Sequence, residues 1–280
     1  MRYYLPDWGQ SLLLVLVFLA GSIASSVLSL AGVESLSAVY AVSMLFPLGY
    51  ALIRSWQAGR SGLCGYVLMD DFRKGGFRCK AAPLLLAVCM VPCATLLLEP
   101  AASLIPMSDA LRQIFEKMFD TSRPVDLFVS TAILAPLCEE TLCRGIICRG
   151  MLSRHKPAVA ILWSAFIFAL MHGNLSQGVM AFSLGILLGW VYYKTHSLWC
   201  TIAMHFTNNA LSVALMYLFP DLPMDATYAD VLPQNIYIFA LVAAALILAA
   251  CIYLINSKID NEKALSFEVC SPSGGEEVGR

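Results

Sequence analysis

The chain contains eight apolar runs that are long enough, or nearly long enough, to cross a lipid bilayer. They span residues 10–32, 37–56, 81–105, 125–150, 157–173, 176–194, 198–219 and 235–256. A membrane-crossing helix needs about 20 mostly apolar residues. The fifth and sixth runs are short and meet at a tight turn, so one of them could instead be buried or re-entrant. The pattern predicts an all-α fold, a polytopic membrane helical bundle of about eight transmembrane helices.

Composition supports lipid as the solvent for much of the surface. Of the 280 residues, 59% are hydrophobic and only 13% are charged, whereas soluble domains carry roughly 25% charged residues. The net charge of −1 gives no indication of a nucleic-acid partner. We therefore expect the lipid bilayer, and no nucleic acid, among the partners.

The chain divides into a long apolar part and a short polar end. We predict a transmembrane helical bundle over residues 1–256 and a polar, disordered cytoplasmic tail over residues 257–280, which ends rich in Gly, Ser and Glu. The first apolar run is too long for the core of a signal peptide, so it is expected to be retained. The segment 106–124 is amphipathic, which predicts a short helix at the membrane interface.

The distribution of Lys and Arg predicts the orientation, because cytoplasmic loops carry the excess of these residues. One set of alternating loops and ends holds Arg2, Arg54, Arg60, Arg73, Lys74, Arg78, Lys80, Arg149, Arg154, Lys156, Lys194, Lys258, Lys263 and Arg280. The opposite loops hold only Arg112, Lys117 and Arg123. Both termini are therefore expected in the cytoplasm. The membrane would be the inner or plasma membrane of a bacterium, or the ER of a eukaryote.

The fourth apolar run carries two adjacent glutamates and an arginine, Glu139, Glu140 and Arg144. A charge at the bilayer centre costs roughly 2.5–3.5 kcal/mol on insertion scales, so such residues face protein or water and mark function. Glu140 and Arg144 are four residues apart and share a helix face, which predicts an ion pair. Glu139 points about 100° away and is left to face a cavity. Pro136, one turn earlier, is expected to kink the helix.

Two later runs add further polar residues. Run five ends in Phe168-Ala169-Leu170-Met171-His172, and run seven holds His205 and Asn209 on one face. Under the predicted orientation His172 falls at the far end of run five, away from Glu139 and His205. A short, submerged or broken fifth helix would bring it back to their depth.

This set of side chains suits amide hydrolysis. Two histidines and a glutamate can activate water, either by proton abstraction or through a metal ion, for which Glu139, His172 and His205 are the candidate ligands. An asparagine amide can donate to a developing oxyanion. The chain has no His-Glu-x-x-His, so the usual zincin arrangement is absent. His155 and His196 lie in short basic loops and are expected to be solvated.

At these residues the chain resembles the CAAX-processing and bacteriocin-processing (CPBP, or Abi) intramembrane endopeptidases, which include the type II CAAX prenyl endopeptidases. The resemblance covers residues 125–215 and rests on Glu-Glu-x-x-x-Arg, Phe-x-x-x-His and His-x-x-x-Asn in this order. It implies that Glu139 is the general base and that Glu140, paired with Arg144, supports it. His172 and His205 would orient water or stabilise charge. Asn209 would help to form the oxyanion hole, and Phe168 would shape the cavity.

The resemblance implies an intramembrane protease without fixing its cofactor or substrate. The family has been described both as metal-dependent and as glutamate-dependent, so either no cofactor or a divalent metal such as zinc is consistent with it. We favour a glutamate–histidine mechanism. The implied partner is a membrane-associated peptide or protein substrate, CAAX-like or bacteriocin/pheromone-like, which enters from the cytoplasmic side.

Two other functions remain as alternatives. A non-catalytic immunity or scaffold protein of the same fold would bind a peptide without cleaving it. The presence of every motif residue favours the enzyme over this alternative. A transporter would also use intramembrane Glu, His and Arg, but transporters usually carry internal repeats, and none is evident in the sequence.

Overall fold

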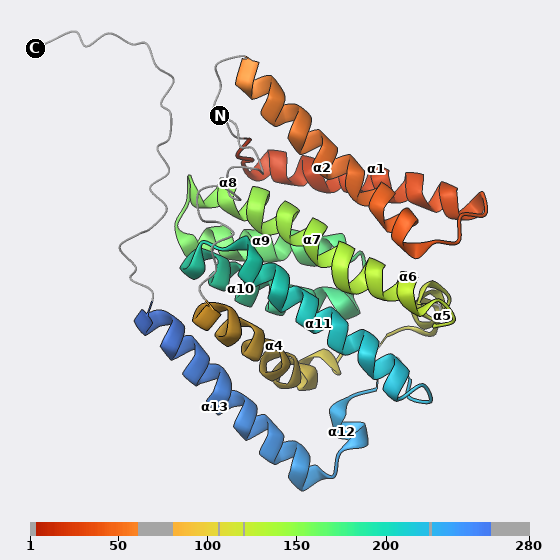
Figure 1. The fold of residues 1–280 in the computed structure, drawn as a ribbon, viewed down its shortest axis with the longest axis vertical. Coiled ribbons are helices and arrows are strands. Elements are labelled where there is room, and N and C mark those ends of the chain that lie inside the picture. Colours follow the sequence, from red (N-terminus) through yellow and green to blue (C-terminus); the bar gives the residue numbers. More distant parts are fainter. Residues whose placement is uncertain (1–3, 61–80, 106, 120, 224–225, 259–280) are drawn as a thin grey trace, which may run out of the picture.

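The computed structural model describes residues 4–60, 81–105, 107–119, 121–223 and 226–258, and within these ranges every regular element is a helix (Figure 1). The predicted tail lies almost entirely outside the described residues. So do seven of the Lys and Arg residues used to predict the orientation: Arg2, Arg73, Lys74, Arg78, Lys80, Lys263 and Arg280.

Five helices are long and apolar enough to cross a membrane, so the chain is a polytopic helical membrane protein. They are α1 (Trp8–Leu30), α2 (Leu36–Arg60), α4 (Ala81–Ala102), α10 (Leu175–Thr195) and α13 (Gln234–Lys258). The other three predicted runs are also helical but are divided, short or more polar. The all-α fold is confirmed, while the full count of eight spans stays a prediction.

The fourth run forms one unbroken helical rod from residue 124 to residue 152, within two residues of the predicted bounds. Along this rod α6 (Pro124–Phe128), α7 (Ala135–Glu140) and α8 (Arg149–Leu152) alternate with two π-helical segments, η1 (Val129–Leu134) and η2 (Thr141–Cys148). The sequence predicted a kink at Pro136 and did not predict the π-helices. Such wide turns are rare and often lie at functional sites.

The fifth run forms a short helix, α9 (Pro157–Met171), of 15 residues. At 1.5 Å per residue it is about 22 Å long, less than the roughly 30 Å of a hydrocarbon core. His172 caps its C-terminus. A short fifth helix was expected to bring His172 to the same membrane depth as the other polar residues, and α9 is short.

The remaining helices complete the bundle. α11 (Leu198–Leu218) carries His205 and two asparagines, and it is not among the five long apolar helices. α5 (Asp109–Met118) begins at a Ser108 cap within the predicted amphipathic segment, and α12 (Tyr228–Val231) precedes α13.

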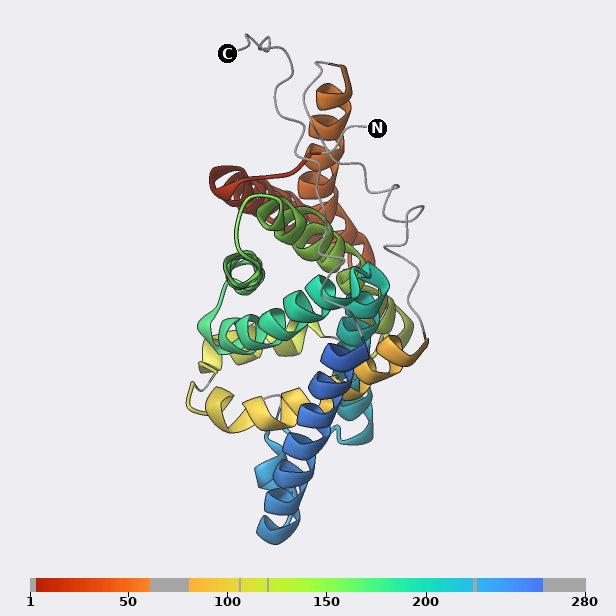
Figure 2. The same cartoon turned by 90° about the vertical axis from the view of Figure 1, so that its left-hand side faces the viewer.

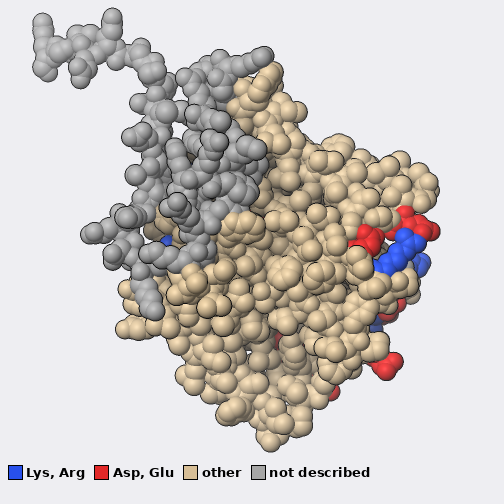
Figure 3. All heavy atoms as spheres, viewed as in Figure 1, with Lys and Arg blue, Asp and Glu red and all other residues tan. Residues whose placement is uncertain are grey.

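The helices pack in pairs around the central rod. α1 packs on α2, α9 on α10, and α4 on both α11 and α13. Figure 2 shows α1 and α2 at one end of the bundle and α13 at the other. Figure 3 shows that charged side chains are sparse on the visible face and gather at one edge, as expected for a surface in contact with lipid.

The close approach of α1 and α2 depends on Gly21. A Cβ atom at this position would overlap the Ser43 carbonyl oxygen and touch the ring of Phe46, both on α2. Small residues allow transmembrane helices to approach closely in this way. Gly49, on α2 itself, has open space where a Cβ would lie.

We expect Gly21→Ala to lower the free energy of unfolding by about 1–3 kcal/mol, because the added methyl group must push the two helices apart. Gly49→Ala is the matched control and should be neutral or slightly stabilising, since alanine favours helix more than glycine does. Unfolding by SDS in mixed micelles measures both. Equal stability of the two variants would contradict the close-packing role of Gly21.

Candidate active site

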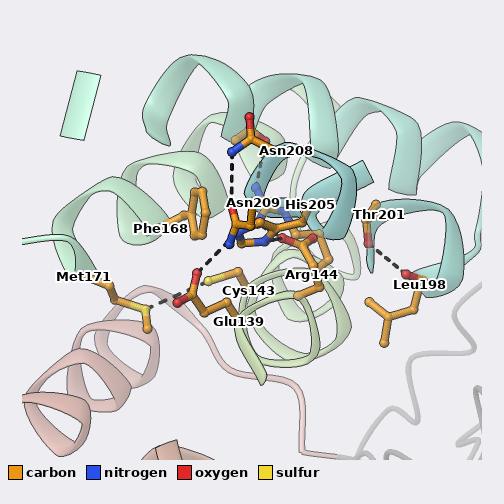
Figure 4. A network of polar contacts seen from close by, with 12 residues as sticks. Glu139, Cys143, Arg144, Phe168, Met171, Leu198, Thr201, His205, Asn208 and Asn209 are labelled. Carbon is orange, nitrogen blue, oxygen red and sulfur yellow. Dashed lines mark hydrogen bonds and ion pairs between the residues drawn. The ribbon is translucent and has the colours of Figure 1, made fainter. Parts of the chain in front are cut away.

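The polar residues predicted from the sequence gather where the central rod meets α9 and α11 (Figure 4). Glu139 and Glu140 lie at the end of α7 and Arg144 lies in η2. Their partners come from helices that are distant in the sequence. The site is therefore made by packing and not by one continuous motif.

The predicted ion pair between Glu140 and Arg144 is present. Arg144 Nη1 donates to Glu140 Oε1 at 2.8 Å, and both side chains are 0% exposed. Arg144 Nη2 donates to the carbonyl oxygen of Gly185 on α10 at 3.0 Å. A side chain at position 185 would crowd the guanidinium group, so glycine keeps this carbonyl within reach. The pair thus joins the rod to α10.

Glu140 has a second partner that the sequence did not predict. His205 Nδ1 lies 2.9 Å from Glu140 Oε1, the same oxygen that accepts from Arg144. Because a carboxylate can only accept, His205 donates through Nδ1–H. Its Nε2 atom then faces the site. The other oxygen, Glu140 Oε2, is buried and has no hydrogen-bond partner among the described residues.

Glu139 points toward the other side of this histidine. Its side chain is 15% exposed, and its Oε2 atom lies 3.9 Å from His205 Nε2. The Oε1 atom accepts a hydrogen bond of 2.9 Å from the Tyr40 hydroxyl group of α2. The two glutamates therefore differ: Glu140 is held in a buried ion pair, whereas Glu139 has one oxygen bonded to Tyr40 and the other directed toward His205.

Tyr40 is a residue that the sequence analysis missed. It lies in a mostly apolar run with no motif, 99 residues from Glu139. The only signal available in the sequence was a hydroxyl-bearing side chain inside a predicted span.

Phe168 lies among the charged groups. Its side chain is 2% exposed. The ring stands edge-on to His172 and His205, with centroid distances of 4.9 Å and 5.5 Å, and Arg144 lies over its face at 4.6 Å. Phe168 therefore contacts both histidines and Arg144, while its predicted role in shaping a cavity stays a prediction.

His172 bonds locally. Its Nδ1 atom lies 2.8 Å from the carbonyl oxygen of Phe168, one turn earlier in α9. Since a carbonyl oxygen only accepts, Nδ1 carries the proton and Nε2 is left as the acceptor in the neutral ring. His172 is half-buried.

Asn209 is hydrogen-bonded to the backbone carbonyl of Thr131, which has no intrahelical donor because residue 136 is a proline. Its Nδ2 atom donates to the Thr131 carbonyl oxygen at 2.8 Å. In the π-helical pattern of η1, Ala135 N–H donates to Ser130, five residues back. The next donor, to Thr131, would be residue 136, but proline has no N–H. Pro136 thus leaves the Thr131 carbonyl to bind the asparagine amide.

Asn208 binds the oxygen of the Asn209 side-chain amide. Asn208 Nδ2 donates to Asn209 Oδ1 at 3.0 Å, while Asn208 Oδ1 lies 3.2 Å from the Thr95 hydroxyl of α4. An Nδ2 group has two hydrogens, so Asn209 keeps one N–H after donating to Thr131. The sequence analysis named Asn209 and missed its neighbour.

The candidate metal ligands do not form a metal site in this arrangement. Within the described ranges no three His, Cys, Asp or Glu side chains lie close enough to share a metal ion. The ring of Phe168 contacts both His172 and His205. A metal-dependent mechanism through Glu139, His172 and His205 is therefore not supported.

The two remaining histidines are less solvated than predicted. His155 and His196 are both half-buried, and the ring of His155 lies 5.0 Å from that of Trp8. Burial, together with the nearby Arg149 charge, lowers the pKa of His196. Neither histidine belongs to the cluster around Glu139.

Comparison with known proteins assigns the segment that holds the site. Residues 121–211 match a family model described as Rce1-like, Type II CAAX prenyl endopeptidase Rce1-like. No curated protein and no solved structure matches the chain. The matched segment contains every predicted site residue, and the family resemblance inferred from the sequence is confirmed.

Proposed function

Since residues 121–211 form an Rce1-like type II CAAX prenyl endopeptidase domain, we propose that this chain is an intramembrane endopeptidase. It hydrolyses peptide bonds of membrane-associated substrates, CAAX-like or bacteriocin/pheromone-like. The observation that carries the proposal is the pairing of Glu139 Oε2 with His205 Nε2, 3.9 Å apart, inside this domain. A carboxylate and an imidazole with reactive atoms facing each other are equipped to move protons.

In the first step water attacks the scissile carbonyl carbon. A water that contacts both facing atoms at about 2.8 Å fits beside a 3.9 Å separation. Its proton passes to Glu139 Oε2 as its oxygen bonds to the carbon. The carbonyl oxygen becomes an oxyanion and accepts the remaining N–H of Asn209.

In the second step the tetrahedral intermediate collapses. The carbon–nitrogen bond breaks, and the proton held on Glu139 passes to the leaving amine. The products are a carboxylic acid and an amine, and the base is returned to its starting state.

The two histidines act beside the base. Glu140 accepts from His205 Nδ1–H and so holds Nε2 toward Glu139, as the carboxylate of a Ser-His-Asp triad orients its imidazole. Arg144 pairs with the buried Glu140 carboxylate and so holds it in place beside His205. His172, with its proton on Nδ1, orients water through Nε2.

The rest of the chain forms the membrane scaffold. We propose eight spans over residues 1–256, with 125–215 as the catalytic core, both termini in the cytoplasm and residues 257–280 as a cytoplasmic tail. The peptide or protein substrate reaches the site from the cytoplasmic side. The mechanism requires only the side chains named above and water.

The test is cleavage of a mixed peptide library, including prenylated peptides, by the purified full-length chain in nanodiscs, read by mass spectrometry. We expect cleavage that persists in excess chelator and is absent in Glu139→Gln. Loss of cleavage on chelation, with recovery on adding zinc, would contradict the metal-independent mechanism. Equal cleavage by wild type and Glu139→Gln would reject Glu139 as the base, and no cleavage of any peptide by a well-folded chain would contradict the proposed activity.

A further inference from the structure

Tyr40 is the one side chain from outside the matched segment that a described hydrogen bond joins to a predicted site residue. It lies on α2, whereas the family domain begins at residue 121. Its hydroxyl oxygen lies 2.9 Å from Glu139 Oε1. A carboxylate only accepts, so the phenol donates. This bond engages one oxygen of the carboxylate and leaves the other facing His205.

Tyr40 is held in place by the same rod that carries Glu139. The carboxylate of Asp126, in α6, accepts from the backbone N–H groups of Leu36 and Ser37 at 2.7 Å and 3.1 Å. It also accepts from the hydroxyl of Ser35, and the Ser37 hydroxyl donates to the Asp126 carbonyl. Asp126 thereby caps the start of α2 and fixes its register against the rod.

This anchoring matters because Tyr40 lies close to the cap. It follows the capped residues by about one helical turn, so fixing the start of α2 also fixes the base of its side chain. The Ser43 hydroxyl donates to the Tyr40 carbonyl at 2.7 Å within the same helix. A side chain on an anchored helix can hold a carboxylate in one orientation.

We propose that Tyr40 is the positioning residue for the base of the proposed hydrolysis, holding the Glu139 carboxylate so that Oε2 faces His205 and the attacking water. This role rests on the proposed endopeptidase activity. It extends the catalytic unit beyond the family domain to α2. Without the phenol hydroxyl the carboxylate rotates about its terminal bond, and the fraction with an oxygen aimed at water falls.

Tyr40→Phe tests the role by removing one oxygen atom and leaving the ring. We expect kcat to fall roughly 10- to 100-fold, the range that corresponds to losing a hydrogen bond to a charged group, with KM unchanged. Tyr50→Phe is the matched control. Tyr50 is on the same helix and packs its ring edge-on against Tyr4, so its loss of a hydroxyl should leave kcat at the wild-type value.

A second readout does not depend on cleavage. The infrared carboxylate band of Glu139 is assigned by its loss in Glu139→Gln. We expect this band to shift in Tyr40→Phe and to stay fixed in Tyr50→Phe.

The outcomes separate the two proposals. A wild-type band position in Tyr40→Phe would overturn the positioning role, whether or not the protein cleaves peptides, and so would an unchanged kcat in an active preparation. A shifted band in a chain that cleaves nothing would keep the Tyr40–Glu139 bond and reject the endopeptidase that the positioning role serves.

Discussion

Replacing Glu139 by glutamine is expected to lower kcat by at least about 100-fold, because general-base catalysis contributes typically 10²- to 10⁴-fold. The amide keeps the size of the side chain, and its oxygen can still accept the hydrogen bond from Tyr40. It cannot take a proton from water. The fold should remain intact, since Glu139 is partly exposed and its contact with a basic side chain, His205, is a long one of 3.9 Å.

The measurement compares kcat on one defined peptide with thermal unfolding of the same preparations. Glu116→Gln is the matched control, because Glu116 is exposed on α5. It should retain wild-type activity and stability. Full activity in Glu139→Gln would reject this residue as the base and would direct attention to His205.

Replacing Arg144 by alanine is expected to lower the free energy of unfolding by about 3–5 kcal/mol, the usual cost of leaving a buried charge without its partner. Glu140 is 0% exposed and would lose its Nη1 donor. The Gly185 carbonyl would lose its donor, and the face of Phe168 would lose the guanidinium above it. All three interactions of the Arg144 side chain lie in the same buried region, so their loss is not compensated by water.

The matched control is Arg123→Ala. Arg123 pairs with Glu34, and both side chains are largely exposed, at 44% and 70%. Exposed pairs contribute about 0–1 kcal/mol, so this variant should be close to wild type. SDS unfolding of both variants measures the difference. An Arg144→Ala protein as stable as Arg123→Ala would contradict the role of the buried pair.

Much of the scaffold could be predicted from the sequence, because apolar runs and helical periodicity are local properties. The run 125–150 became a rod over residues 124–152. The four-residue spacing of Glu140 and Arg144 predicted their ion pair, and the 100° offset predicted the separate direction of Glu139. A short fifth helix was named as the condition that would bring His172 to the site.

The rest could not be predicted, because periodicity gives the faces of a helix and not the helices that those faces meet. The bond from Tyr40 to Glu139 and the bond from His205 to Glu140 both join helices distant in sequence. The π-helical segments were missed since their extra residue leaves no mark in an apolar pattern. The contact of Phe168 with His205 likewise depends on tertiary packing.

The π-helical turns of η1 make the site sensitive to insertions and deletions. Their five-residue hydrogen-bond spacing places Pro136 opposite the Thr131 carbonyl. It also fixes the direction of the Glu139 side chain relative to Asp126, which caps α2 at the start of the rod. Adding or removing one residue within η1 would turn everything after it by about 100°. A related chain with such an insertion or deletion would still contain every motif residue, yet its glutamate would no longer be directed toward the histidine.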